Sequence, residues 1–150
     1  MRINTKIKNI LLTLMILPSL TYADNEKLFF LTVTVDDLRN SKGTIQFSLY
    51  NKEGSIPDEE YEKYYKQKIG TIENGSSSMV FSNLPKGIYA VNILHDENSN
   101  GKIDKGFILP IEGIGFSNFH SIGITSRPNF IKASFKLSTN IKKLIKIIYM

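Results

Sequence analysis

The sequence predicts an all-β fold, an antiparallel β-sandwich of about seven strands. Short segments rich in β-branched and aromatic residues recur along the chain, and several alternate apolar with polar residues. Turn-forming glycine, asparagine and proline residues separate these segments. A chain of 150 residues, 41% of them hydrophobic, can bury one core. We expect a single sandwich domain over residues 24–139, preceded by residues 1–23 and followed by a tail at 140–150.

Residues 1–23 have the pattern of a secretory signal peptide. Three basic side chains lie near the start, an apolar run occupies 10–17, and the segment ends on Thr21-Tyr22-Ala23. Small residues at that point suit cleavage, and the apolar run is too short to span a membrane comfortably. The alternative is an uncleaved N-terminal anchor. We expect an exported protein, periplasmic or secreted to the cell surface, whose mature chain begins near Asp24.

Composition excludes several classes of function. The chain has no cysteine, so it has neither disulfides nor a thiol nucleophile. The formal net charge is +5, but residues 1–23 hold three of the 19 basic residues and none of the 14 acidic ones, which leaves +2. Without the three lysines of the tail the balance is −1. A nearly neutral body gives no reason to expect nucleic-acid binding.

The first two predicted strands are residues 28–35 and 44–50. The first is rich in Leu, Phe, Thr and Val, and the second alternates polar with apolar residues. This alternation predicts which side chains face the core (Ile45, Phe47 and Leu49) and which face solvent (Gln46 and Ser48). The polar residues 36–43 form a turn, so we expect the two strands to make a hairpin.

Residues 51–67 differ from the strands around them. Pro57 followed by Asp58-Glu59-Glu60 is typical of the start of a short helix, with acidic side chains near its positive end. Three tyrosines fall on one face of such a helix: Tyr61, Tyr64 and Tyr65. We expect this helical insertion to pack on the sandwich. The alternative is an aromatic platform that binds a glycan, a peptide or a small molecule.

Further strands follow this insertion. Their predicted ranges are 69–73, 77–83, 88–94, 107–114 and 130–137. Asn74-Gly75 is a strong hairpin-turn signal between the first two. Pro110 predicts an edge or irregular path for the fourth, and the last alternates apolar residues again.

A calcium-loop pattern follows the strand at 88–94. Oxygen-bearing side chains occupy loop positions one, three, five and nine, and glycine occupies position six: Asp96, Asn98, Asn100, Asp104 and Gly101. The backbone carbonyl of Lys102, at position seven, would face the same ion. Calcium is a hard cation that takes six to eight oxygen ligands. We therefore expect Ca²⁺ as a cofactor, with Asp96, Asn98, Asn100, Lys102 and Asp104 as metal ligands.

The pattern lacks the glutamate that a helix-loop-helix calcium site places at position twelve, where this chain has Phe107. Glu97 points away from the ion by alternation, whereas Glu112 would add a carboxylate if its loop folds back. Few charged ligands predict weak binding, with a Kd of about 10⁻⁴ to 10⁻³ M. The alternative is that the Asp and Asn side chains only cap turns.

No catalytic pattern is recognisable. The two histidines, His95 and His120, are too few for a zinc site. Ser117 lies close to His120 in sequence, but nothing supplies an orienting acid or an oxyanion hole. Gly113 and Gly115 precede no helix start, so they do not form a phosphate loop. We expect a non-enzymatic domain with a binding or structural role; a ligand-binding module and a hydrolase are the alternatives.

The last residues, Ile141–Met150, predict a short basic amphipathic helix. Apolar residues have helical spacing, and three lysines share another face: Ile141, Leu144, Ile145 and Ile148 against Lys142, Lys143 and Lys146. One interpretation is a terminal strand or helix that covers an edge of the sandwich. The other is contact with an anionic membrane surface or a protein partner.

Several motifs resemble a known family. Residues 81–91, Phe-Ser-Asn-Leu-Pro-Lys-Gly-Ile-Tyr-Ala-Val, look like the strand-turn of prealbumin-like and carboxypeptidase-regulatory-like sandwiches. Together with 95–104 and 112–118, they are similar to the DUF2141 family of bacterial proteins. The similarity covers roughly residues 30–138 and leaves the tail outside. It implies an exported Ig-like or prealbumin-like sandwich and no particular activity. Ile114 departs from the tyrosine usual in the family.

Overall fold

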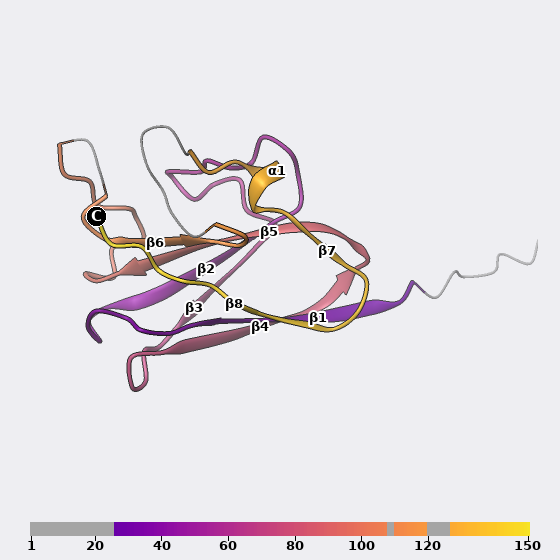
Figure 1. The fold of residues 1–150 in the computed structure, drawn as a ribbon, viewed down its shortest axis with the longest axis horizontal. Coiled ribbons are helices and arrows are strands. Elements are labelled where there is room, and N and C mark those ends of the chain that lie inside the picture. Colours follow the sequence, from indigo (N-terminus) through magenta and orange to yellow (C-terminus); the bar gives the residue numbers. More distant parts are fainter. Residues whose placement is uncertain (1–25, 108–109, 120–126) are drawn as a thin grey trace, which may run out of the picture.

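The computed structural model describes residues 26–107, 110–119 and 127–150. Figure 1 shows two β-sheets packed face to face, with a layer of loops and the short helix α1 over the second sheet. The fold is therefore an all-β sandwich, as predicted. The predicted signal peptide, residues 1–23, lies outside the described residues.

The first sheet has the strand order β4-β1-β8. Strand β1 (Leu28–Val35) lies in the middle, antiparallel to β4 (Ser77–Pro85) and parallel to β8 (Ile141–Leu144). The predicted hairpin of the first two strands is wrong, because β2 (Thr44–Tyr50) belongs to the other sheet. Residues 36–43 carry the chain from one sheet to the other.

The second sheet has the order β3-β2-β5-β6, and its neighbouring strands are antiparallel. Its other members are β3 (Lys66–Gly70), β5 (Gly87–Asp96) and β6 (Gly113–Phe116). Strand β7 (Phe135–Leu137) pairs with the first residues of β5. Because β5 lies between β2 and β6 and ends at Asp96, it places the candidate loop at one end of the sandwich.

Inward-facing side chains of both sheets fill the main core. The predicted inward residues of β2 are confirmed, since Ile45, Phe47 and Leu49 are fully buried. Strand β1 contributes alternate residues in the same way. The other buried members of this core are Phe29, Leu31, Val33, Val35, Phe81, Leu84, Tyr89, Val91, Ile93, Leu137, Ile145 and Ile147.

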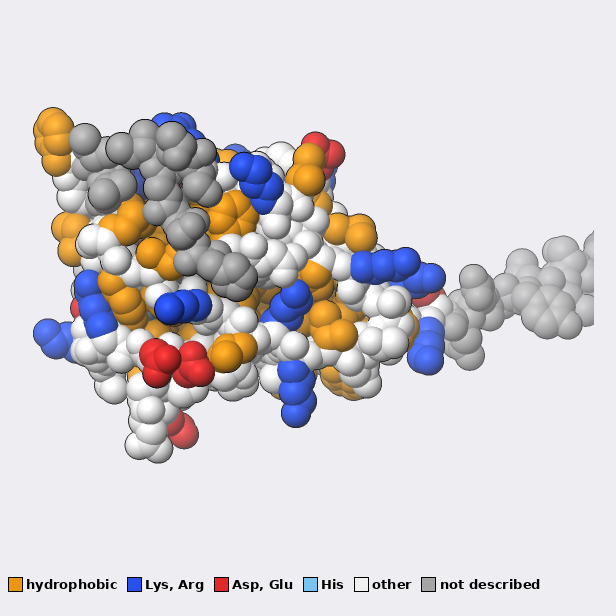
Figure 2. Space-filling model, viewed as in Figure 1, with side chains coloured by type: hydrophobic (Ala, Val, Ile, Leu, Met, Phe, Trp, Pro, Cys, Tyr) orange, Lys and Arg blue, Asp and Glu red, His pale blue; other side chains and the backbone are white. Residues whose placement is uncertain are grey.

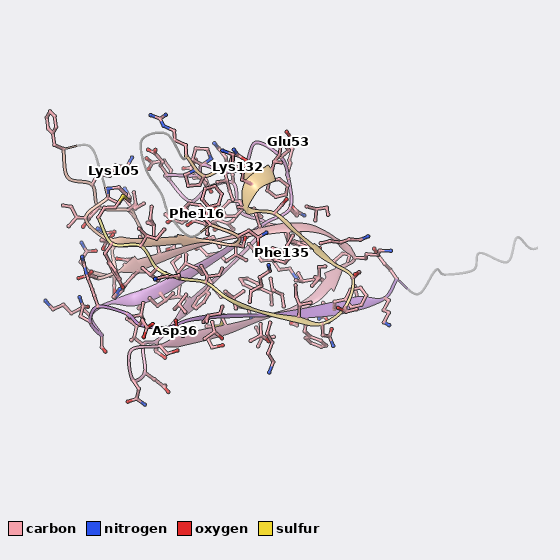
Figure 3. The ribbon with its side chains drawn as sticks, in the orientation of Figure 1. Asp36, Glu53, Lys105, Phe116, Lys132 and Phe135 are labelled. Carbon is pink, nitrogen blue, oxygen red and sulfur yellow. The ribbon has the colours of Figure 1, made fainter. Side chains whose placement is uncertain are left out.

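The outer face of the second sheet is also buried. Side chains from the loop layer form a second cluster against it, which includes Phe116, labelled in Figure 3. Its other buried members are Tyr50, Ile56, Tyr61, Ala90, Leu94, Ile114, Phe119, Phe130 and Ala133. The prediction that Gln46 and Ser48 face solvent is wrong, since they are 2% and 0% exposed. Alternation distinguishes two sheet faces, but it does not reveal that distant segments cover both.

Turns replace the helix predicted after Pro57. The buried carboxylate of Asp58 accepts hydrogen bonds from the backbone N–H groups of Glu62 (3.1 Å) and Lys63 (2.8 Å) and from the hydroxyl of Tyr50 (3.0 Å). Tyr61 has φ +52°, which a right-handed helix does not contain. A single carboxylate inside the turn therefore organises this segment in place of a helical hydrogen-bond ladder.

Only the last three residues of the predicted strand at 130–137 are a strand, β7. Helix α1 (Phe130–Ala133) precedes β7, and the side chain of Asn129 caps it by accepting a hydrogen bond from the N–H of Lys132 (2.9 Å). Phe130 and Ala133 are buried, whereas Ile131 is exposed, which is the spacing of a helical turn.

The predicted strand at 107–114 begins later and ends later in the structure, where β6 spans Gly113–Phe116. Phe107 is fully exposed, and residues 108–109 lie outside the described part of the chain. The predicted hairpin turn at Asn74-Gly75 is confirmed, because Glu73 and Ser76 exchange backbone hydrogen bonds of 2.8 and 3.0 Å across it.

The helix predicted for the tail is wrong. Beyond β8 the chain remains extended, and the N–H of Ile145 donates to the carbonyl of Thr34 (2.9 Å). The free edge of β1 offers unpaired backbone groups that an extended segment satisfies and a helix does not. The interpretation that the tail covers an edge of the sandwich is confirmed, with a strand and not a helix in that place. Because Ile145 and Ile147 are buried, they are not available to a membrane surface.

Basic side chains are dispersed over the face of the molecule drawn in Figure 2. Figure 2 shows Lys and Arg side chains on one face, spread singly among apolar and uncharged groups. Two of the lysines protect the free edge of β4: Lys66 donates to the carbonyl of Ser82 (3.2 Å), and Lys68 donates to that of Val80 (2.7 Å). In the described part of the chain, no helix has the length and apolarity needed to cross a membrane.

Candidate calcium-binding loop

The candidate loop leaves the second sheet at the end of β5. Asp96 is the last residue of the strand and is 2% exposed, whereas the side chains of Asn98, Asn100 and Lys102 are exposed. The loop lies at the end of the sandwich where Figure 1 marks the C-terminus and Figure 3 labels Lys105. A rigid strand therefore fixes the first predicted ligand, while the following ones lie on a solvent-facing turn.

The carboxylate of Asp96 organises the turn. One oxygen accepts the N–H of Asn100 (3.0 Å), and the other accepts the N–H of Gly101 (2.7 Å). Ser99 and Gly101 both have positive φ, +58° and +76°, which folds the chain back over the end of β5. Gly101 adopts this conformation without strain, and the loop spacing predicted a glycine turn at this position, the sixth of the loop.

The structure brings Asn98, Asn100 and Asp104 together. The side-chain amides of Asn98 and Asn100 donate to the two oxygens of the Asp104 carboxylate, at 2.6 and 3.1 Å respectively. The side-chain oxygen of Asn98 accepts the N–H of Asn100 (3.0 Å), and that of Asn100 accepts the N–H of Lys102 (2.7 Å). The predicted ligands on side chains thus form one hydrogen-bonded group.

Glu112 folds back onto the loop, but it holds the backbone. Its side chain is almost fully buried, and its two oxygens accept the N–H groups of Glu97 (2.8 Å) and Asp104 (3.0 Å). One carboxylate therefore joins the two ends of the loop. Burial raises the pKa of Glu112 and outweighs these two hydrogen bonds, and the charges of Asp96 and Asp104 raise it further.

Glu97 points away from the loop, as alternation predicted. Its carboxylate accepts hydrogen bonds from Nε of Arg39 (2.6 Å) and from the amide of Asn40 (3.0 Å). Burial alone would raise the pKa of Glu97, but the hydrogen bonds from Asn40 and Arg39 and the charge of Arg39 hold it below its ordinary value. No local pattern in the sequence indicated Arg39, because 58 residues separate it from Glu97.

His95 is completely buried and engaged at both ring nitrogens. Nε2 lies 2.9 Å from the carbonyl oxygen of Lys42. Because a carbonyl oxygen can only accept a hydrogen bond, Nε2 carries a proton and donates it. In the neutral ring, Nδ1 accepts a hydrogen bond from the Tyr149 hydroxyl (2.7 Å). The other histidine, His120, lies outside the described residues, and no cluster of three His, Asp or Glu side chains in the described ranges is arranged to hold a metal.

Ser117 is a structural residue in the described chain. Its hydroxyl is buried, donates to the carbonyl of Ala133 (2.6 Å) and accepts the N–H of Val91 (2.9 Å).

We expect Ser117→Ala to lower the free energy of unfolding by about 1–3 kcal/mol, because the buried N–H of Val91 then loses its partner. Urea unfolding measures this effect. A matched substitution at the exposed Ser138→Ala should change it little.

The three tyrosines of the ligand-binding alternative do not share one face. Tyr61 is buried in the second cluster, whereas Tyr64 and Tyr65 are 39% and 41% exposed. The ring of Tyr65 lies against that of Tyr89, with centroids 6.3 Å apart. A glycan platform would therefore rest on Tyr64 and Tyr65 alone, and ligand binding there stays a prediction.

Comparison with family models assigns the chain to a protein family. A family described as uncharacterized protein conserved in bacteria (DUF2141) matches residues 33–144. The chain belongs to the DUF2141 family. The DUF2141 match runs from β1 to the end of β8 and includes the whole candidate loop and Glu112. The predicted resemblance is confirmed, although the tail is not wholly outside it, because the match ends at Leu144. Comparisons with curated proteins and with solved structures gave no match.

Proposed function

We propose that this DUF2141 protein is a non-enzymatic, exported β-sandwich domain whose loop 96–104 binds Ca²⁺ weakly. The observation that carries the proposal is the meeting of the Asn98 and Asn100 amides with the carboxylate of Asp104. In the same turn, the carboxylate of Asp96 accepts two backbone N–H groups. In the bound form, calcium would order this loop and support a binding or structural role of the sandwich.

The chemistry of the loop suits a hard cation. The side-chain oxygens of Asp96, Asn98 and Asn100 accept hydrogen bonds from backbone N–H groups, which hold them in place. Each such oxygen has a further lone pair that a cation can use. The amide protons that now meet Asp104 would give way to the ion, which offers that carboxylate a full positive charge.

Electrostatics supports the same assignment. The negative charges of Asp96 and Asp104 contribute to the raised pKa of Glu112, so each of these two carboxylates repels that of Glu112. A divalent cation among Asp96, Asn98, Asn100 and Asp104 would offset this repulsion. Because only two of the four side chains are charged, we expect a Kd of about 10⁻⁴ to 10⁻³ M, which is the range of extracellular calcium modules.

Two features support a non-enzymatic, exported protein. Ser117 and His95 use their polar atoms to hold the fold, so neither offers a free nucleophile or base. Residues 1–23 have the charge, apolar run and small terminal residues of a signal peptide, and the chain has no cysteine. We expect the secreted chain to begin near Asp24. The test is to express the protein with residues 1–23 in place and to determine the N-terminal sequence of the secreted product.

We expect calcium to raise the melting temperature of the protein. At 10 mM Ca²⁺ the Kd proposed above corresponds to a stabilisation of about 1.4–2.7 kcal/mol. Thermal melting with 0–10 mM Ca²⁺, and with Mg²⁺ as the ion control, measures the shift. The shift should disappear in Asp96→Ala and Asp104→Ala but remain in Glu73→Ala, which removes an exposed carboxylate at a distant turn.

A cooperative melt with no calcium response would overturn the proposal. The Asp and Asn side chains would then be turn caps only. An equal shift in Glu73→Ala and Asp104→Ala would also count against it, because it would place the effect elsewhere on the protein.

A further inference from the structure

The C-terminal segment, residues 145–150, closes the side of the sandwich between the two sheets. Ile145 donates to Thr34 of β1, and Ile148 exchanges two backbone hydrogen bonds with Ile114 of β6, at 3.0 and 2.8 Å. The side chains of Ile145 and Ile147 enter the main core. Figure 1 shows this segment, in yellow, crossing the sandwich to end beside the candidate loop.

Two glycines of β6 make room for the segment. A Cβ on Gly113 would lie 2.5 Å from Cγ2 of Ile147 and 2.8 Å from Cδ1 of Tyr149. A Cβ on Gly115 would lie 2.7 Å from the carbonyl oxygen of Lys146. The strand that follows Glu112 is thus shaped to receive the last residues of the chain.

Tyr149 anchors the segment at the loop end. Its hydroxyl donates to Nδ1 of His95 (2.7 Å) and accepts the backbone N–H of Arg39 (3.3 Å). His95 immediately precedes Asp96, the first residue of the candidate loop. The last aromatic side chain of the protein therefore contacts the strand end from which the loop departs.

Arg39 connects Tyr149 to both flanks of the loop. Its guanidinium lies over the Tyr149 ring, 4.5 Å from the centroid, and pairs with the carboxylate of Glu97. It also donates to the carbonyl of Ile111 (3.0 Å), the residue before Glu112. Glu97 and Glu112 are themselves joined, because the backbone N–H of Glu97 donates to the side-chain carboxylate of Glu112 (2.8 Å). One side chain thus contacts the C-terminal segment and the two segments that hold the loop closed.

We propose that ion binding in loop 96–104 and seating of the C-terminal segment are coupled through Arg39 and Tyr149. This inference rests on the proposed calcium site and adds its regulation. Both events require the same arrangement of Glu97 and Ile111, so whichever occurs first removes part of the ordering cost of the other. Because coupling is reciprocal, the segment strengthens ion binding by the factor by which the ion strengthens seating.

Hydrogen exchange of the purified protein tests the coupling. In 10 mM Ca²⁺, relative to Mg²⁺, the amides of Ile145 and Ile148 should exchange about five-fold more slowly or better. The amides of β3, at the far edge of the second sheet, serve as the internal reference for global stabilisation and should slow less. Asp96→Ala should remove the difference.

The reciprocal measurement is the calcium affinity of Tyr149→Ala. We expect it to be weaker by about five-fold or more, whereas Tyr64→Ala, which truncates an exposed tyrosine elsewhere, should leave it unchanged. If Tyr149→Ala does not fold, amide hydrogen exchange of Ile145 and Ile148 in the wild-type protein still tests the coupling.

Two results would count against the coupling and are distinguishable. A calcium-dependent melting shift without selective slowing at Ile145 and Ile148 would overturn the coupling and leave the calcium site standing. Absence of any calcium response in the melt would overturn the site itself, and the coupling with it.

Discussion

Replacing Gly43 with alanine is expected to destabilise the fold by about 3 kcal/mol or more. Gly43 has φ +67°, and a Cβ there would lie 2.6 Å from the carbonyl carbon of Glu97, 2.7 Å from its Cα, and still closer to the carbonyl oxygen of Asp96. These are backbone atoms, so no side chain can turn aside to relieve the clash. Either the turn at 36–43 or the candidate loop must move, and we expect the calcium response to be lost together with stability.

Gly54→Ala is the matched control for this substitution. Gly54 also has a positive φ, +78°, but a Cβ there meets nothing within 4 Å. Its cost should be the backbone strain alone, about 1 kcal/mol. Urea unfolding of both variants gives two losses of stability, and the difference between them is the cost of the clash between a Cβ at position 43 and the loop backbone. Equal unfolding midpoints would show that the turn and the loop do not constrain each other.

Replacing Glu112 with alanine is expected to cost about 2–5 kcal/mol of unfolding free energy. The substitution leaves the buried N–H groups of Glu97 and Asp104 without acceptors, at about 1–3 kcal/mol each, and relief of the buried charge offsets part of this loss. Glu112→Gln keeps one acceptor oxygen and should lose about half as much. Denaturant unfolding without calcium measures both.

The control for Glu112 is another glutamate near the same loop. Glu59 pairs with Lys105 at the surface, where 62% of its side chain is exposed. Glu59→Ala should change stability by less than about 1 kcal/mol, because exposed ion pairs contribute little. If Glu112→Ala unfolds at the same urea concentration as Glu59→Ala, the carboxylate does not hold the loop ends.

Local patterns in the sequence predicted local structure well. The strands at 28–35 and 44–50 have the predicted bounds. The first was predicted from its β-branched and aromatic residues and the second from its alternation, and both signals are local. The turn that follows Asp96 was also predicted from a local pattern, and its calcium binding stays a prediction. Its spacing places oxygen-bearing side chains on one tight turn, and Gly101 adopts the positive φ that this turn needs.

Long-range arrangement was not predictable in the same way. The parallel pairing of β1 with β8 and the contact of Arg39 with Tyr149 join residues about 110 positions apart, and no local spacing records them. The tail shows the limit clearly. Its apolar residues fit a helical period over ten residues, yet the unpaired edge of β1 decides for an extended chain.

The position of β8 has a consequence for the order of folding events. The N–H of Phe30 is bonded to the side chain of Asn140, across 110 residues of sequence, and Ile145 and Ile147 complete the main core. Contacts between such distant residues form late, because a long loop must close before they contribute. A chain made or translocated from its N-terminus therefore acquires its last core residues only at the very end. Under the export that we propose above, the sandwich would be completed only after these last core residues had crossed the membrane.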